Sequence, residues 1–110
     1  MANGWVGFDL DGTLAKYDGW QGNEHIGEPI LPMLSLVQGY LTNDVEVRIF
    51  TARVSSQNPD REKALKSIET WCLFHLGTIL PVTSEKDFQM IDLYDDRCHH
   101  VEANTGRILG

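Results

Sequence analysis

Apolar residues along the chain follow two kinds of pattern, short continuous runs and longer stretches with helical spacing. Runs of the length of buried strands occupy residues 5–10, 45–50, 79–83 and 90–94. Between the first two runs, and again between the second and third, apolar residues recur every three or four positions, which predicts two helices. This alternation predicts a single α/β domain over residues 1–110, with parallel strands joined by crossover helices.

Proline, asparagine and glycine residues indicate where the two helices begin and end. The first should begin near Pro32, because proline suits a first helical turn, and should end at Asn43. The second should begin with Asn58 as N-cap and Pro59 at the first helical position. Gly77 is expected to cap its end, where a left-handed backbone favours glycine.

Three segments lie outside these elements. Residues 12–27 form a loop rich in Gly, Asp and Asn, with Tyr17 and Trp20 embedded in it. Residues 84–89 leave room for only about one helical turn before the last strand. Residues 101–108 carry an Asn-Thr-Gly turn between two short apolar ends, which predicts a small hairpin.

Composition narrows the class of protein. A chain of 110 residues has room for one core, and 42% hydrophobic with 23% charged residues is usual for a globular domain, so disorder is not expected. The net charge of −7 disfavours a broad basic surface for gripping a polynucleotide. A phosphate site would therefore have to be locally basic or neutralised by a metal.

Cysteine content and hydropathy bear on the compartment. Cys72 and Cys98 are too few for a disulfide framework and are expected to be reduced thiols. No stretch approaches the roughly 20 apolar residues of a membrane span, and the first five residues do not resemble a signal peptide. We expect a cytoplasmic protein with no membrane partner.

Acidic and hydroxyl side chains stand at the ends of the expected strands. Asp9 and Asp11 close the first strand, Thr51 the second and Asp95 the last. Right-handed crossovers place the carboxyl ends of parallel strands at one edge of the sheet, where open α/β folds bind ligands. Asp9, Thr51 and Asp95 are therefore expected to meet, although 42 and 44 residues separate them along the chain. Neighbouring carboxylates suit metal binding or paired nucleophile and acid/base chemistry.

The strand end Asp9-Leu10-Asp11-Gly12-Thr13-Leu14 resembles motif I of the haloacid dehalogenase (HAD) superfamily. Three further segments are similar to the remaining family motifs, in the family's order: residues 47–51 ending in Thr51, then Lys86, then residues 91–96 ending in Asp95-Asp96. The resemblance spans nearly the whole chain and implies a three-layer, Rossmann-like parallel sheet. It extends to the phosphatase domain of phage-type polynucleotide kinases and to small HAD proteins carried by phages.

For catalysis, the resemblance implies phosphoryl transfer through an aspartyl-phosphate. Asp9 would attack phosphorus, and Asp11 would protonate the leaving oxygen and later deprotonate the hydrolytic water. Thr51 would donate its hydroxyl to a phosphoryl oxygen. Lys86 would place a positive charge beside the nucleophile.

For the metal, the resemblance implies Mg²⁺, which favours oxygen ligands. Its expected ligands are Asp9, the backbone carbonyl of Asp11, and Asp95. Asp96 would act through a water molecule or orient the catalytic lysine. Asp92 lies within its strand rather than at its end and is expected to be structural.

Substrate contacts are expected from the residues that flank these motifs, namely Gly12, Thr51, Ala52, Arg53 and Arg97. Either arginine could grip a phosphate bidentately, or could instead pair with the surplus acidic residues.

No gap between the motifs is long enough for the cap domain that many HAD enzymes carry, so an open site is expected. Tyr17 and Trp20 could cover it as a small flap, or could simply anchor their loop; a neighbouring subunit of a homo-oligomer could also cover it.

The resemblance implies a Mg²⁺-dependent phosphomonoesterase that acts on a nucleotide or another small phosphorylated metabolite. One alternative is a 3′-phosphatase that acts on nucleic-acid ends. Another is a non-catalytic binding module on the same fold. A phospho-acceptor domain of the receiver type is disfavoured, because there the acidic pair comes early and the phosphorylated Asp lies in mid-chain.

Overall fold

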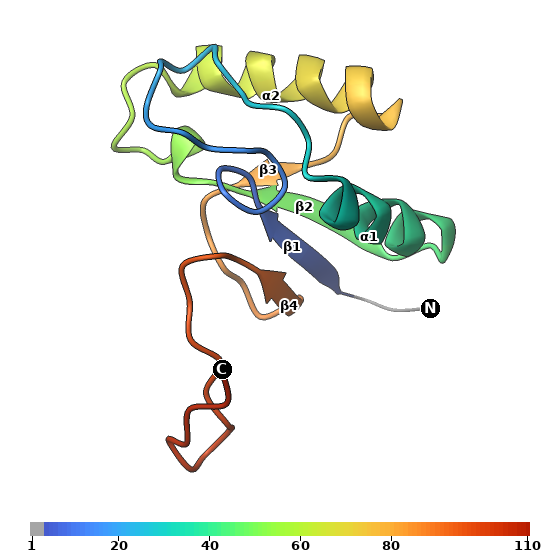
Figure 1. The fold of residues 1–110 in the computed structure, drawn as a ribbon, viewed down its shortest axis with the longest axis vertical. Helices are drawn as coiled ribbons and strands as arrows, with labels where there is room; N and C mark the ends of the chain where they lie inside the picture. Colours follow the sequence, from blue (N-terminus) through green and yellow to red (C-terminus); the bar gives the residue numbers. More distant parts are fainter. Residues whose placement is uncertain (1–3) are drawn as a thin grey trace.

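The computed structural model describes residues 4–110 and shows an α/β fold built on a four-stranded parallel sheet (Figure 1). The strand order is β3-β2-β1-β4, and every neighbouring pair is parallel. The elements in chain order are β1 (Trp5–Asp9), α1 (Leu31–Thr42), β2 (Glu46–Phe50), a short 3₁₀ helix η1 (Ala52–Val54), α2 (Arg61–Leu76), β3 (Val82–Thr83) and β4 (Met90–Tyr94). The predicted parallel α/β fold is confirmed.

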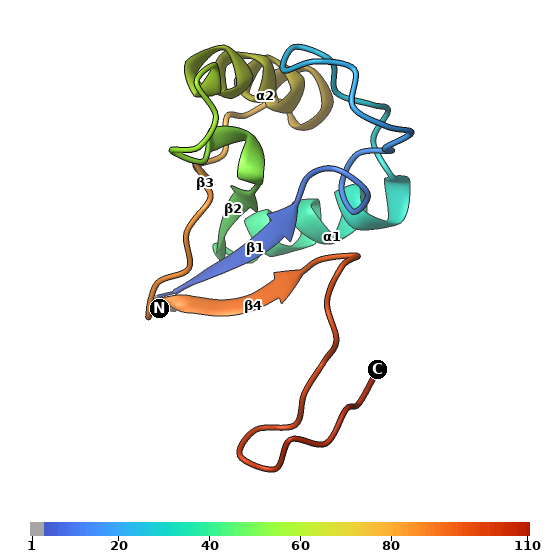
Figure 2. The same ribbon diagram turned by 90° about the vertical axis from the view of Figure 1, so that its left-hand side faces the viewer.

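Both helices pack on one face of the sheet. Val6 and Phe8 of β1 alternate onto this face and join one buried cluster with Val37 of α1 and Ile68 of α2. Within residues 4–110, no helix covers the other face (Figure 2). The three layers expected from the sequence are therefore two. In this part of the chain, no helix has the length and apolar character needed to cross a membrane.

On the face of the sheet without helices, the indole ring of Trp5 packs over the strands. Trp5 is fully buried, and its ring lies over Gly7, where a Cβ would come within 2.9 Å of it. The guanidinium of Arg48 packs on the ring at 4.7 Å from its centroid, and the indole N–H donates to Asp87 at 2.8 Å. Asp87 belongs to the six-residue crossover from β3 to β4, which carries a turn and no helix. The sequence left room for about one helical turn here, and the crossover uses that space for a turn instead.

Two element limits also differ from the prediction. α2 begins two residues late, with Asp60 as its N-cap, because the Asn58 side chain accepts the Asp60 N–H at 3.0 Å and holds a turn before the helix. Its C-cap, Gly77, has the predicted left-handed backbone, with φ of 76°. β3 is confined to two residues, and the expected strand start at Ile79 is an exposed loop position.

The chain after β4 forms an arm that lies apart from the sheet and helices in both ribbon views (Figures 1 and 2). Val101 and Ile108 form an antiparallel bridge, so the predicted hairpin is confirmed. Cys98 at the start of the arm is a free, exposed thiol, and Cys72 is free and buried on α2, as expected.

Candidate functional site

The strand order reverses between β1 and β4. From β1 the chain builds the sheet outward through β2 and β3, and then returns to place β4 on the opposite side of β1. Such a reversal leaves a crevice outside the carboxyl ends of the two central strands, where open α/β sheets bind ligands. In Figure 2 the arrowheads of β1 and β4 point to the same side of the molecule, toward the loop that follows β1.

Three carboxylates meet at this reversal. Asp9 ends β1, while Asp95 and Asp96 directly follow β4, and one oxygen from each lies within 4.8 Å of the others. The predicted meeting of Asp9 with Asp95 is confirmed. Three hard oxygen donors in so small a space suit Mg²⁺ or another hard divalent cation. Asp92, in the middle of β4, is exposed and lies outside the cluster, as expected.

The Gly-Thr pair after Asp11 holds Asp96 in this cluster. Gly12 has φ of 91°, and a Cβ on it would lie 2.6 Å from the Asp96 Oδ2, so only glycine lets the carboxylate approach. The Thr13 hydroxyl donates to the Asp96 Oδ1 at 3.0 Å and accepts the Asp96 N–H at 2.9 Å; the Asp9 Oδ2 is also near it, at 3.4 Å. Thr13 thus ties the turn after β1 to the end of β4.

Crowding of the acids changes the protonation of Asp9. Burial raises its pKa to about 8, assisted by a hydrogen bond with Asp96 and by repulsion from Asp95, Asp96 and Asp11. Burial also opposes ionisation of Asp96, but hydrogen bonds from Asp9 and Thr13 outweigh it and lower the pKa of Asp96. Without a cation the cluster therefore retains a proton near neutral pH. Protein sites that crowd carboxylates in this way gain from a bound metal ion.

We expect the metal-free protein to lose stability as the pH rises. The folded-state pKa of Asp9, about 8, lies above its ordinary value of 3.8, so its contribution is complete below about pH 4 and is lost through pH 8. Because Asp9 is only partly buried, solvent screens part of the destabilisation. We therefore expect a Tm only about 5 °C lower at pH 9 than at pH 6 in EDTA.

Mg²⁺ should raise Tm more at pH 9 than at pH 6, since it binds the ionised cluster. Asp9→Asn should flatten the pH dependence in EDTA. Differential scanning fluorimetry measures Tm against pH for the wild type with EDTA, the wild type with Mg²⁺, and Asp9→Asn with EDTA. If Tm fell as steeply with pH in Asp9→Asn as in the wild type, Asp9 would not be the group responsible.

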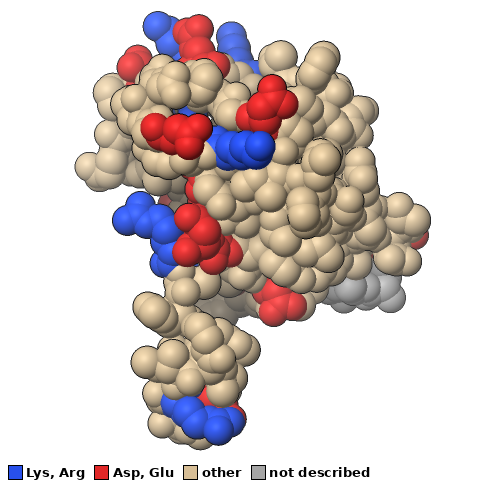
Figure 3. Space-filling view, viewed as in Figure 1, with Lys and Arg blue, Asp and Glu red and all other residues tan. Residues whose placement is uncertain are grey.

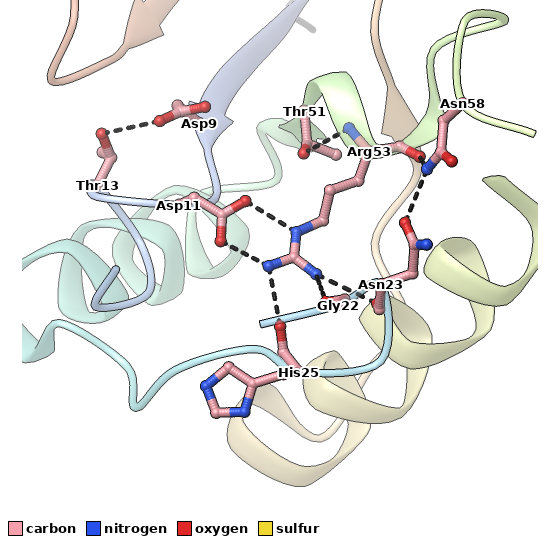
Figure 4. Close-up of polar contacts among 9 residues, drawn as sticks. All are labelled: Asp9, Asp11, Thr13, Gly22, Asn23, His25, Thr51, Arg53 and Asn58. Atoms are coloured by element: carbon pink, nitrogen blue, oxygen red, sulfur yellow. Dashed lines mark hydrogen bonds and ion pairs between the residues drawn. The ribbon is translucent and has the colours of Figure 1, made fainter. Parts of the chain in front are cut away.

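Asp11 is not part of the carboxylate cluster. Both of its oxygens pair with Arg53, at 2.8 Å from Nε to Oδ2 and 2.9 Å from Nη2 to Oδ1 (Figure 4). Of the two roles considered for Arg53, the structure shows the ion pair with an acidic residue. A bidentate pair of this kind is among the strongest polar contacts in proteins.

A hollow of about 390 Å³ adjoins the cluster. It is lined by Asp9, Asp11, Tyr17, Trp20, Thr51, Ala52, Arg53, Asn58, Asp96 and Arg97. Thr51 is buried at the end of β2, and its Oγ1 accepts the Arg53 N–H at 3.2 Å, which leaves its own hydroxyl proton free to donate. Of the predicted substrate contacts, only Gly12 is not among the lining residues, because it lies against Asp96 instead.

Two residues depart from what the sequence suggests. Lys86 is exposed on the β3–β4 crossover and does not line the hollow, so its catalytic role stays a prediction. Asn58, interpreted from sequence only as a helix cap, lines the hollow and donates from Nδ2 to the Asn23 Oδ1 at 2.8 Å and to the Arg53 carbonyl at 2.7 Å. An asparagine before a proline carries no sequence signal for such a long-range contact.

Comparisons of the chain with protein-family models, with curated proteins and with solved structures give no match. The chemistry of the site is therefore inferred from its own residues. On the face drawn in Figure 3, acidic and basic side chains are interspersed and form no continuous basic field.

Proposed function

We propose that the chain is a Mg²⁺-dependent phosphomonoesterase of the HAD type, which forms an aspartyl-phosphate on Asp9. The observation that carries the proposal is the convergence of Asp9 with Asp95 and Asp96 at the reversal of strand order, beside a hollow lined by Thr51. The order of the four motif-like segments along the chain supports the same chemistry.

The donor set fits Mg²⁺. Oxygens of Asp9, Asp95 and Asp96 would hold the ion, where burial and the neighbouring acids raise the pKa of Asp9. The chemistry supplied by Mg²⁺ there is neutralisation of the charge on the phosphoryl oxygens. Asp9 would act as the nucleophile in its ionised form, which a bound cation would favour.

The remaining roles follow from position. An Asp9 oxygen forms a bond to phosphorus while the bond from phosphorus to the leaving oxygen breaks. Asp11 supplies the proton that this oxygen takes up, and because Arg53 pairs with its ionised form, Asp11 must first take that proton from solvent water. Thr51 offers its free hydroxyl proton to a phosphoryl oxygen. Water then attacks phosphorus, passes its proton to Asp11 and releases phosphate from Asp9. Asp9 follows Trp5 and Gly7 in the alternation of β1, which directs it to the face that the Lys86 crossover traverses.

The rim of the hollow favours a substrate with a flat aromatic group. Trp20 and Tyr17 are 56% and 47% exposed, although both line the hollow. Arg97 is the exposed cation beside it and is free to meet a substrate phosphate. Together with the net charge of −7, these features favour nucleotides and small aromatic phosphomonoesters over nucleic-acid ends.

The test is hydrolysis of phosphomonoesters with and without Mg²⁺. Nucleoside monophosphates, glycerol phosphate and a 3′-phosphorylated oligonucleotide separate the substrate classes, and phosphate release is the measurement. Trp20→Ala should raise KM for a nucleoside monophosphate about tenfold, since stacking on a base is worth roughly 1–3 kcal/mol, and should leave KM for glycerol phosphate unchanged.

Equal effects of Trp20→Ala on both substrates would contradict base stacking. Cleavage of the oligonucleotide alone would replace the small-molecule substrate with a nucleic-acid end.

A further inference from the structure

Every N–H of the Arg53 guanidinium is already committed within the protein. Its side chain is about 5% exposed. Two N–H groups bind Asp11, and the other three donate to backbone carbonyls: Nη1 to Asn23 at 3.2 Å and Gly22 at 3.4 Å, and Nη2 to His25 at 2.9 Å (Figure 4). Because a guanidinium has five N–H groups, none remains for a substrate phosphate unless a contact breaks.

These carbonyls belong to residues 17–25, the tip of the loop that follows β1. The base of the loop is fixed by backbone contacts, such as the hydrogen bond from the Lys16 N–H to the Glu28 carbonyl at 2.8 Å. Across the described chain, the side-chain hydrogen bonds to residues 17–25 come from Arg53 and from Asn58. Trp20 covers the guanidinium, with its ring centroid 4.9 Å from the Arg53 Cζ.

The loop tip has backbone freedom of its own. Gly19 and Gly22 have φ of 110° and 104°, and a Cβ on either would meet nothing within 4 Å. The backbone at Gly19 and Gly22 is therefore not held by packing, and the position of residues 17–25 depends on the contacts made with them by side chains outside the loop. Within residues 4–110, Arg53 makes three of the four side-chain hydrogen bonds to these residues, and Asn58 makes the other.

We propose that Arg53 is a positioning residue that fixes the carboxylate of Asp11 and the loop tip in a single arrangement. The same side chain then places the loop over the hollow and orients Asp11 toward the leaving oxygen. The inference rests on the proposed function for its catalytic half, whereas the clamp on the loop is independent of it. Asp11, Tyr17 and Arg53 line both the main hollow and a neighbouring one of about 330 Å³, so the ion pair forms part of the wall between the two.

The expected effect is on turnover rather than on binding. A proton donor must lie within hydrogen-bond reach of its acceptor, and a displacement of about 1 Å can cost about 100-fold in rate. Arg53→Ala should therefore reduce kcat about 100-fold and change KM less than about threefold. Arg53→Lys should not restore it, because an ammonium cannot bridge both oxygens of Asp11 and three carbonyls.

The experiment uses the full chain with Mg²⁺ and a nucleoside monophosphate, whose alkoxide leaving group requires a proton, and compares Arg53→Ala, Arg53→Lys and the surface control Lys66→Ala. Methylguanidinium at millimolar concentration should partly restore kcat in Arg53→Ala, by occupying the vacated site. Acrylamide quenching of fluorescence gives the second readout. Trp5 and Trp71 are buried and Trp20 is not, so quenching reports mainly on the loop, and Trp20→Phe identifies that component. Quenching should increase in both Arg53 variants and stay unchanged in Lys66→Ala.

A rise in KM of tenfold or more with an unchanged kcat would overturn the proposal, because it would show that Arg53 grips the substrate. Full activity in Arg53→Lys would overturn it too, and this variant, which keeps the charge and the stem, decides the matter if Arg53→Ala does not fold. If the wild type hydrolyses no phosphomonoester, the proposed function fails, but quenching still tests the clamp. Unchanged quenching in both Arg53 variants would then refute it.

Discussion

Asp9→Asn should reduce kcat for phosphomonoester hydrolysis by at least about 1000-fold, since removal of a nucleophile costs more than loss of any supporting group. The amide that replaces the carboxylate cannot form the acyl-phosphate bond. The fold should survive, because the substitution removes repulsion from Asp95 and Asp96 rather than a packed apolar group. Phosphate release with saturating Mg²⁺, together with far-UV circular dichroism, measures both effects.

Two further observations make this prediction decisive. Beryllium fluoride should be trapped against Asp9 in the wild type, and a crystal structure of that complex would show it. Asp92→Asn is the matched control, since Asp92 is an exposed acid in the adjacent strand outside the cluster. Near-normal turnover in Asp9→Asn would exclude a covalent mechanism on this residue.

Asp95→Asn is expected to raise the Mg²⁺ concentration needed for half-maximal activity well over tenfold, since loss of even a group that orients a ligand costs about 10–100-fold in affinity. Asp95 follows β4 directly and offers its oxygen to the same point as Asp9. Its Oδ1 also accepts the Arg97 N–H at 2.8 Å, which an amide oxygen can still do, so the turn should persist.

Asp92→Asn again supplies the comparison and should leave Mg²⁺ activation unchanged. Titration of activity with Mg²⁺, and isothermal calorimetry of Mg²⁺ binding in the absence of substrate, give independent values. The same Mg²⁺ dependence in both variants would mean that the metal lies elsewhere on the strand end.

Periodicity alone predicted most of the fold. The apolar runs at β1, β2 and β4 and the helical spacing in α1 and α2 all produced the expected elements. β1, β2 and both helices contribute buried residues to one core, whereas β4 packs only its partly buried Tyr94 against it. β3 was overestimated. Its apolar run resembles a strand, but Leu80 is buried in the core while Ile79 faces solvent, and only Val82 and Thr83 pair with β2. A short apolar run does not specify how much of it will pair.

The missing third layer had no local signal. The chain crosses from β3 to β4 in six residues, and Trp5, Arg48 and Asp87 close the bare face by contacts between distant positions. Sequence periodicity indicates which side of a single element is buried. The packing of Trp5, Arg48 and Asp87 depends instead on how β1, β2 and the β3–β4 crossover lie relative to one another.

The site was predictable where topology determined it. Parallel strands bring Asp9 and Asp95 to one edge whatever the details of packing, and the structure confirms that meeting. The role of Arg53 was not predictable to the same degree. Its choice between a substrate phosphate and Asp11 depends on where the loop tip lies, and three of its five partners are carbonyls, which every residue type carries.

The loop is therefore held by its main chain, and this has an evolutionary consequence. Substitutions at Gln21 or Tyr17 can change the lining of the hollow of about 330 Å³ while the carbonyls of Asn23 and His25 continue to meet Arg53. Ligand preference and attachment of the loop can thus diversify independently. A lineage of such proteins could acquire new specificities by drift on this loop without passing through an inactive ancestor.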